Sequence, residues 1–199
     1  KLRTEQEVVF QLPAITDAQS EILPEPMPLD ILHEDEDVAV INKPPGLCVH
    51  PAPGHWQGTL VNGLLARYPQ MAYIGSIRRP GIVHRIDLDT SGALVVALTP
   101  LAYQRLIKMM KARAIKREYL AVVHGIPQAG AATINAPIGR NPEHRRRFAI
   151  AGIAARPAIT HYEILERFAH ASLLKVRLDT GRTHQIRVHM KSLGHPICG

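Results

Sequence analysis

The sequence predicts an α+β protein with a mixed, largely antiparallel β-sheet and flanking helices. Apolar runs of strand length outnumber helical patterns and follow one another along the chain, which disfavours a doubly wound parallel fold. With 199 residues the chain can bury one sizeable core, with or without a small appendage. Its hydrophobic content of 46% and charged content of 21% are typical of globular proteins.

The N-terminal part of the chain differs in composition from the rest. Residues 1–12 are expected to be the tail of an upstream domain, and residues 13–28 carry several prolines with polar spacers. Such a segment is typical of an extended linker. The compact domain is therefore expected to cover residues 29–199. Because the chain begins at Lys1 rather than Met, we expect its natural N-terminus further upstream.

Strands are expected where short apolar runs end at turn-forming residues. Residues 82–83 should lead as a short strand into a tight turn that closes with Thr90, Ser91 and Gly92. The longer strands are expected at residues 37–42, 93–98, 118–123, 158–165 and 173–178.

Helices are indicated by caps and by apolar residues at helical spacing. Thr59 is a plausible N-cap, Thr99 followed by Pro100 predicts a second helix start, and a third helix is expected from Gly181 onwards. The residues expected to face inward are Leu60, Leu64 and Leu65, then Tyr103, Leu106, Ile107 and Met110, then Ile186, Met190 and Leu193.

The charge balance points to a polyanionic partner. The net charge is +7 and the pI is about 9.7, although many basic proteins bind no nucleic acid. The cations gather in two clusters, and we expect both to contact phosphate. They consist of Lys108, Lys111, Arg113, Lys116 and Arg117, and of Arg140 with Arg145, Arg146 and Arg147.

Cysteine content and hydropathy bear on the compartment. Only Cys48 and Cys198 occur, too far apart in the sequence to suggest a disulfide framework, which favours a reducing compartment. No stretch approaches 18 uninterrupted apolar residues, so a transmembrane helix is not predicted. A cytoplasmic protein is expected.

Residues 81–92 hold the densest group of reactive side chains. His84, Arg85, Asp87 and Asp89 follow an apolar lead-in, and a turn presents such side chains from a rigid base. The two aspartates could simply cap the turn, with His84 and Arg85 solvated, since Asx turns are common. The other interpretation is that one aspartate is a catalytic carboxylate.

The string His-Arg-Ile-Asp-x-x-Thr-Ser-Gly closely resembles the central motif of the RluA/RluD branch of pseudouridine synthases. The resemblance implies that Asp87 is the catalytic carboxylate. Residues 116–119 resemble a second family segment and supply Tyr119. Residues 180–189 resemble a third and supply Arg187 as the partner of the aspartate. Arg182, His184 and Gln185 of this segment are expected to support the site or to bind backbone. The three catalytic residues implied are thus Asp87, Tyr119 and Arg187.

The resemblance extends over residues 28–199, with residues 42–46 and 50–51 matching the family's opening motif. It implies the pseudouridine synthase fold and the isomerisation of specific uridines in structured RNA, with 23S ribosomal RNA favoured. It also implies an upstream S4-type RNA-binding domain ending in residues 1–12, and a catalytic domain over residues 29–199 that is incomplete at its C-terminus. No cofactor or metal is expected, because the reaction involves neither redox change nor an external group. The residues expected to contact RNA are His84, Arg85, Lys116, Arg145, Arg146, Arg147, Arg182 and His184.

The same residues disfavour two other classes of enzyme and leave two alternative functions open. A zinc enzyme is disfavoured because His184 and His189 are not at the i, i+4 spacing and no Cys-x-x-Cys occurs. An aspartic protease is disfavoured because basic residues crowd the Thr-Gly sequence after Asp179. A non-catalytic RNA-binding or ribosome-assembly protein on the same scaffold, and a tRNA-directed synthase, stay as alternatives. RNA is the expected partner for the synthase and for both of these alternatives. The protein is expected to be a monomer without membrane association.

Overall fold

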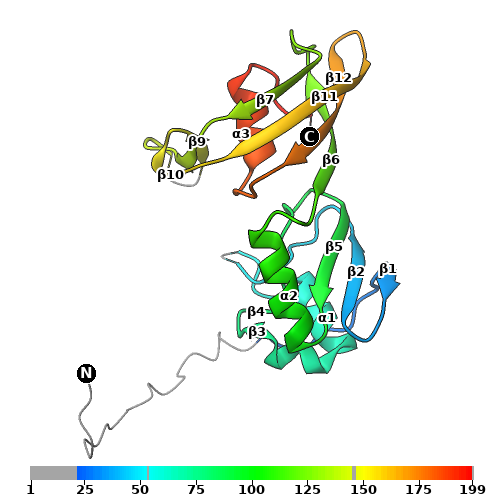
Figure 1. Cartoon of the computed structure of the whole chain (residues 1–199). Helices are drawn as coiled ribbons and strands as arrows, with labels where there is room; N and C mark the ends of the chain where they lie inside the picture. Colours follow the sequence, from blue (N-terminus) through cyan, green and yellow to red (C-terminus); the bar gives the residue numbers. More distant parts are fainter. Residues whose placement is uncertain (1–21, 53, 145–146, 199) are drawn as a thin grey trace, which may run out of the picture. The chain divides into compact units, whose positions relative to one another are not determined.

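The computed structural model describes residues 22–52, 54–144 and 147–198, and the chain divides into two compact units, Lys1–Gln104 and Arg105–Gly199. All strand pairs named in either unit are antiparallel. In the described part of the chain, three α-helices accompany the sheets, and Figure 1 shows their arrangement within each unit. The predicted α+β class with antiparallel pairing is therefore confirmed. Within the described residues, no helix is long and apolar enough to cross a membrane.

The N-terminal unit is built around a three-stranded sheet in the order β1-β2-β5. The strands are β1 (Ile31–Glu34), β2 (Val38–Lys43) and β5 (Gly92–Ala97). The remaining elements are helix α1 (Leu60–Arg67), the 3₁₀ helix η1 (Pro69–Tyr73) and a short hairpin of β3 (Gly75–Ser76) and β4 (Arg79–Pro80). Helix α2 (Pro100–Lys111) begins in this unit and spans the boundary.

Two predicted helix starts are confirmed by their caps. The backbone N–H of Thr59 donates to Asn62 Oδ1 over 2.9 Å, which satisfies a donor at the start of α1. At the start of α2, the Ala102 N–H donates to Thr99 Oγ1 over 3.2 Å. Strand β2 alternates half-buried and buried residues, so its core face carries Ala39, Ile41 and, unexpectedly, Lys43.

The predicted short strand at residues 82–83 is wrong. Only an isolated bridge between Ile82 and Val96 forms, and residues 83–87 are neither strand nor helix. The turn itself is present, because the Thr90 N–H donates to the Asp87 carbonyl over 3.1 Å. The loop therefore forms a single β-bridge with the edge of β5 and does not continue as a strand.

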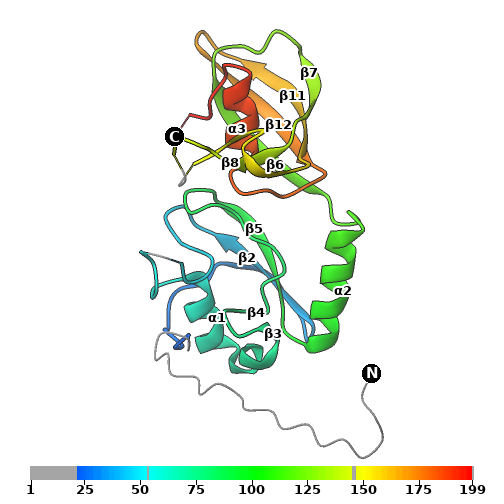
Figure 2. The ribbon, with the colours of Figure 1, turned by 90° about the vertical axis from the view of Figure 1, so that its left-hand side faces the viewer.

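The C-terminal unit contains a four-stranded sheet in the order β6-β12-β11-β7. Helix α3 (Gln185–Ser192) covers one face of it (Figure 2), and Met190 of α3 is fully buried in its core with Val123, Leu174 and Val176. The strands are β6 (Arg117–His124), β7 (Ala131–Asn135), β11 (Ile159–Arg167) and β12 (Ala171–Leu178). The predicted strands at 118–123, 158–165 and 173–178 are confirmed.

A second, smaller sheet of this unit was not predicted. Its order is β10-β8-β9, from β8 (Ile138–Arg140), β9 (Phe148–Ile150) and β10 (Ile153–Arg156). The chain approaches itself so closely here that a Cβ on Gly139 would lie 2.5 Å from the Gly152 carbonyl oxygen. Strands of three or four residues between glycines and prolines give too short an apolar pattern to identify from sequence.

Helix α3 begins later than predicted. Residues 181–184 form a loop, and Gln185 is the first helical residue. The inward orientation of Met190 is confirmed, whereas that of Leu193 is wrong. Leu193 lies at the C-cap and is 44% exposed, because the helix ends at Ser192.

Candidate functional site

The predicted catalytic carboxylate lies in a loop whose backbone is held firmly. Asp87 is half-buried and Asp89 is exposed, on either side of Leu88. The Leu88 carbonyl accepts two hydrogen bonds, from Lys43 Nζ over 2.8 Å and from the Gly46 N–H over 3.0 Å. The peptide between the two aspartates is thus fixed to the turn that follows β2.

Lys43 is the cation at the centre of this arrangement. Its side chain is fully buried, and its ammonium group also donates to the carbonyls of Pro44 over 2.7 Å and Leu47 over 2.8 Å. Burial lowers the pKa of Lys43, while Cys48, Asp89 and Asp87 act in the opposite direction. The ammonium uses its three donors on carbonyls, which makes Lys43 a positioning residue for the Asp87 loop.

His84 also ties this loop to the sheet. Its Nε2 accepts a hydrogen bond from the Val95 backbone N–H over 3.1 Å, so in the neutral ring the proton resides on Nδ1. His84 is half-buried rather than solvated, and this contact gives it a structural function. Arg85 is exposed. RNA contact by either residue stays a prediction.

The other predicted catalytic residues belong to the C-terminal unit. Tyr119 is half-buried on β6 and packs on the core to which Ile186 of α3 also contributes. Tyr119 therefore lies on the sheet face that α3 covers, and Arg187 is a half-buried residue of that helix. The pairing of Arg187 with Asp87 stays a prediction.

A buried hydrogen-bond network seats the start of α3 on the sheet. Gln185 Nε2 donates to the Ile159 carbonyl over 3.0 Å and to Thr160 Oγ1 over 2.9 Å. Gln185 Oε1 accepts from Thr180 Oγ1 over 2.8 Å and from the Arg182 N–H over 3.0 Å. Because the side-chain amide of Gln185 is satisfied on both ends, the first turn of α3, which carries Arg187, has a defined position.

His189 continues the same network. Its Nε2 lies 3.0 Å from the Ala136 carbonyl oxygen, which can only accept, so Nε2 carries the proton. Its Nδ1 then accepts from the hydroxyl of Thr160 over 2.9 Å. The fully buried imidazole is therefore matched to its neutral form, and burial lowers the pKa of His189 against the opposing effect of the Ala136 carbonyl.

Acidification is expected to destabilise the protein through its buried histidines. Burial, followed by the charges of Arg79 and Arg85, lowers the pKa of His50 to about 4. A lowered histidine pKa means that protons bind better to the unfolded chain, so stability is full above about pH 6.5 and is lost towards pH 4. For His50 this amounts to about 2 kcal/mol at pH 5.

Urea unfolding at pH 7.5 and pH 5 measures this effect, with the unfolding of each unit followed separately. His50→Gln should remove most of the pH dependence of the N-terminal unit and leave that of the C-terminal unit, where His189 lies. If the stability of the N-terminal unit depended on pH equally in wild type and His50→Gln, His50 would not be the source of this pH dependence.

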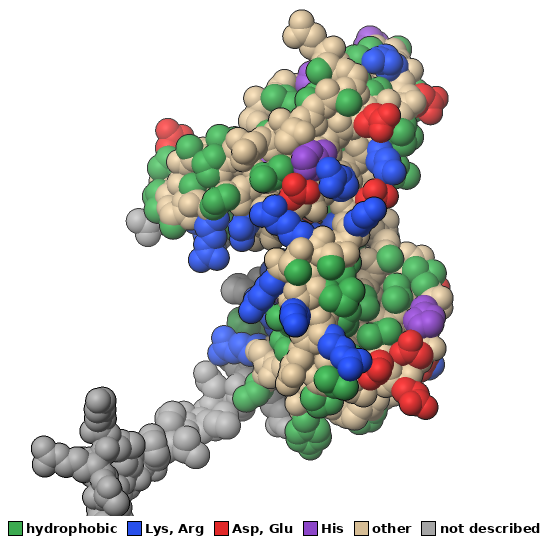
Figure 3. Space-filling model, viewed as in Figure 1, with side chains coloured by type: hydrophobic (Ala, Val, Ile, Leu, Met, Phe, Trp, Pro, Cys, Tyr) green, Lys and Arg blue, Asp and Glu red, His purple; other side chains and the backbone are tan. Residues whose placement is uncertain are grey.

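The predicted RNA-contacting residues of the C-terminal unit have different environments. Lys116, Arg147 and His184 are exposed, and Figure 3 shows Lys and Arg side chains gathered along one border of this unit. Arg182 is half-buried and donates from Nε to the Pro157 carbonyl over 3.0 Å, so part of its function is structural. Arg145 and Arg146 lie outside the described residues.

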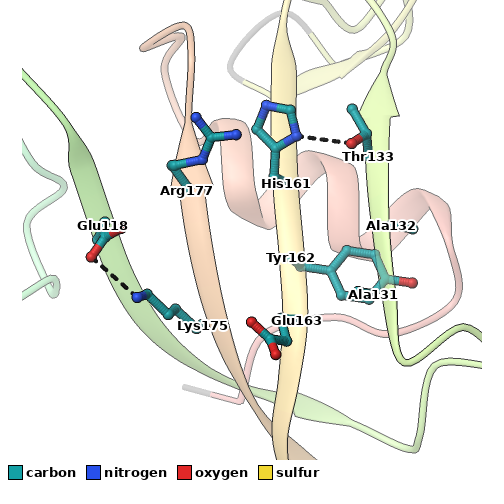
Figure 4. Close-up of a pocket in the computed structure, with 9 residues that line it drawn as sticks. All are labelled: Glu118, Ala131, Ala132, Thr133, His161, Tyr162, Glu163, Lys175 and Arg177. Atoms are coloured by element: carbon teal, nitrogen blue, oxygen red, sulfur yellow. Dashed lines mark hydrogen bonds and ion pairs between the residues drawn. The ribbon is translucent and has the colours of Figure 1, made fainter. Parts of the chain in front are cut away.

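A hollow of about 450 Å³ opens on the other face of the four-stranded sheet (Figure 4). It contains none of the predicted catalytic residues, and several of its polar groups are paired. Thr133 Oγ1 lies 2.8 Å from His161 Nδ1, and Lys175 Nζ lies 3.4 Å from a Glu118 carboxylate oxygen. His161 Nε2 lies 3.0 Å from Asp179, which lowers the pKa of that carboxyl. This face is a solvated, internally paired sheet surface.

The sequence did not identify Lys43 as a positioning residue, whereas Gln185 was expected, with Arg182 and His184, to support the site or to bind backbone. The alternation along β2 was the available signal for Lys43, because it places the residue in register with buried Ala39 and Ile41. Of the four partners of Gln185, Thr180 and Arg182 are near it in the sequence, whereas Ile159 and Thr160 are more than twenty residues away. Within the described residues, no group of three or more His, Cys, Asp or Glu side chains could hold a metal ion.

Comparisons with known proteins agree with the motifs. A family model described as RNA pseudouridylate synthase matches residues 37–192. An uncharacterized RNA pseudouridine synthase of Synechocystis is 46% identical, with 100% of this chain and 61% of the relative covered. Ribosomal large subunit pseudouridine synthase D of Neisseria meningitidis serogroup A is 49% identical, with 89% of this chain and 46% of the relative covered.

Solved structures give the same result. Human RNA pseudouridylate synthase domain containing 1 superposes with a TM-score of 0.69 at 31% identity, covering 85% of this chain and 67% of that one. Human RNA pseudouridylate synthase domain containing 4 gives 0.67 at 26% identity, covering 85% and 66%. The chain spans 61% and 46% of the length of the two curated relatives described above.

Proposed function

Since the chain belongs to the RNA pseudouridylate synthase family, we propose that it isomerises specific uridines of large-subunit ribosomal RNA to pseudouridine. The observation that carries the proposal is the Asp87 loop, a half-buried carboxylate beside a peptide that a buried lysine fixes. A protein that only binds RNA has no use for a carboxylate held towards a polyanion. The name of the Neisseria relative supports ribosomal RNA as the substrate.

The reaction breaks the C1′–N1 glycosidic bond, rotates the base and rejoins it through C5. The Asp87 carboxylate either attacks the substrate or takes a proton from the sugar, and both functions require its ionised form. Burial against a base raises a carboxyl pKa, and a guanidinium at hydrogen-bond distance opposes this effect. Arg187 provides the guanidinium in our proposal. No cofactor takes part.

Tyr119 and the basic residues bind and orient the uridine. The Tyr119 ring stacks on the base and its hydroxyl can transfer a proton. A uridine within folded RNA must be extruded, and unstacking costs a few kcal/mol that phosphate contacts offset. Arg85 and His84 flank the site where the extruded nucleotide enters. The proposal further includes a monomeric, cytoplasmic enzyme with an upstream S4-type domain.

The proposal is tested by incubating the full-length protein with unmodified ribosomal and transfer RNA. Carbodiimide-dependent stops of reverse transcription then map each new pseudouridine. Stops in 23S ribosomal RNA are expected. Stops confined to transfer RNA would identify the protein as a tRNA-directed synthase. Tight binding without any stop would identify it as a non-catalytic RNA-binding protein.

Charge reversal of Arg145, Arg146 and Arg147 to glutamate is expected to weaken RNA binding for all sequences. Each lost phosphate contact reduces the slope of log K against log salt by about 0.7–0.9. Filter binding at several salt concentrations measures the slope. A slope equal to that of wild type would show that these arginines do not contact the RNA phosphates.

A further inference from the structure

Three planar side chains of the C-terminal unit form a continuous group that the proposed chemistry does not use. Arg140 of β8 and Phe148 of β9 are direct partners in the strand register. The guanidinium carbon of Arg140 lies 4.9 Å from the centroid of the Phe148 ring. On the same ring, the imidazole of His184 is arranged edge to face, with centroids 6.0 Å apart and an interplanar angle of 82°.

Exposure distinguishes this group from an ordinary core. Arg140 and His184 are exposed, and Phe148 is half-buried beneath them. Helix α3 lies next to β9, the strand that carries Phe148, and the two polar partners of the ring stay at the surface. A cluster that served packing alone would bury its planar faces rather than present them to solvent.

The backbone of His184 supports a function for its ring. His184 is the N-cap of α3 and has left-handed dihedrals, φ 54° and ψ 27°, and its side chain makes no capping hydrogen bond. A residue other than glycine in this region costs roughly 1–2 kcal/mol, and such residues cluster at binding sites. The Gln185 amide satisfies the Arg182 N–H at this helix start, so the imidazole is not needed for capping.

The charge around the group fits an anionic polymer. Residues 137–158 contain five arginines and one carboxylate, Glu143. Figure 3 shows Lys and Arg side chains along the border of the unit near the end where Figure 1 labels β9 and β10. Planar cationic and aromatic groups among arginines are what an unstacked nucleotide requires, with a face for the base and cations for the phosphate.

We propose that Arg140, Phe148 and His184 form a stacking site for one unpaired nucleobase of the RNA. The guanidinium and imidazole contact the base, and Phe148 holds both in place. Stacking on such groups tolerates any base, because every base has a π-face. The identity of the polymer as RNA rests on the proposed function, whereas the geometry of the stack does not.

The test measures binding of a short single-stranded RNA containing 2-aminopurine, whose fluorescence is quenched by stacking. Phe148→Leu removes the ring but keeps apolar volume, and His184→Asn removes the imidazole with a residue that tolerates left-handed dihedrals. Each should weaken binding roughly ten-fold and reduce quenching, with an unchanged salt slope. Phe148→Tyr, which keeps the ring, should bind like wild type.

Arg140 distinguishes stacking from simple charge. Arg140→Lys keeps the charge but loses the plane, so it should lose quenching and keep most of the salt slope. The proposal is overturned if Phe148→Leu and His184→Asn bind and quench like wild type, or if Arg140→Lys does. If Phe148→Leu melts early, His184→Asn decides the result.

The failure of this inference is separable from that of the proposed function. Binding and quenching need no turnover. A protein that stacks the probe but forms no pseudouridine would therefore contradict the proposed function and support the stacking site. Pseudouridine formation by the wild type, together with normal binding by Phe148→Leu and His184→Asn, would support the proposed function and contradict the stacking site. Equal binding of wild type to an RNA and to a polyphosphate without bases also overturns the stacking site.

Discussion

Asp87→Asn will abolish pseudouridine formation while RNA binding persists. An amide keeps the shape and the hydrogen-bonding size of the carboxylate, but it has neither the negative charge nor the basicity that the reaction requires. We expect the rate to fall by on the order of 10³–10⁴-fold or more. Single-turnover assays on 23S ribosomal RNA measure the rate, and filter binding measures the affinity.

The matched control for this prediction is Asp89→Asn. Asp89 lies in the same loop and, like Asp87, acts on the pKa of Lys43, but it is exposed. The substitution removes the same charge from the same neighbourhood, so a rate near that of wild type is expected. If both variants lost activity equally, the loss would follow from the charge of the loop rather than from Asp87 as the reacting group. An active Asp87→Asn protein would remove Asp87 from the catalytic role.

Much of the fold follows from periodicity along the sequence. The alternation in β2 and the caps at Thr59 and Thr99 are local, so they are readable without tertiary contacts. Leu193 shows the limit of this reasoning. Its spacing matches an inward position, but the helix ends one residue earlier and the side chain is exposed.

The contacts that position the site residues could not be predicted from the sequence, because many of them join distant parts of the chain. Gln185 reaches Ile159 and Thr160, which are more than twenty residues away in the chain. Phe148 contacts Arg140 on the neighbouring strand and His184 before helix α3, and neither contact can be predicted from the sequence around Phe148. Motif resemblance selected Asp87, Tyr119 and Arg187, but it could not indicate which neutral or buried groups hold them.

Lys43→Met is expected to have the largest effect on stability. Methionine fills a similar volume, but it leaves the carbonyls of Pro44, Leu47 and Leu88 without their charged donor. A partly buried carbonyl that loses its partner costs about 1–3 kcal/mol before relaxation and hydration, and the Leu88 carbonyl keeps the Gly46 N–H, so we expect a loss of about 3 kcal/mol for the N-terminal unit. Urea unfolding at pH 7.5 measures the loss.

The same substitution should also reduce catalysis in protein that is still folded. The Leu88 carbonyl keeps its bond from the Gly46 N–H but loses that from Lys43, so the peptide beside Asp87 gains freedom. Because misplacement of a reacting group by about 1 Å can cost about 10²-fold in rate, kcat should fall by one to two orders of magnitude while RNA affinity is retained. Lys191→Met, at an exposed lysine of α3, provides the control and should change stability by less than about 0.5 kcal/mol. Wild-type stability and kcat in Lys43→Met would show that the Asp87 loop is held by its other contacts, and a normal kcat with reduced stability would limit Lys43 to the fold.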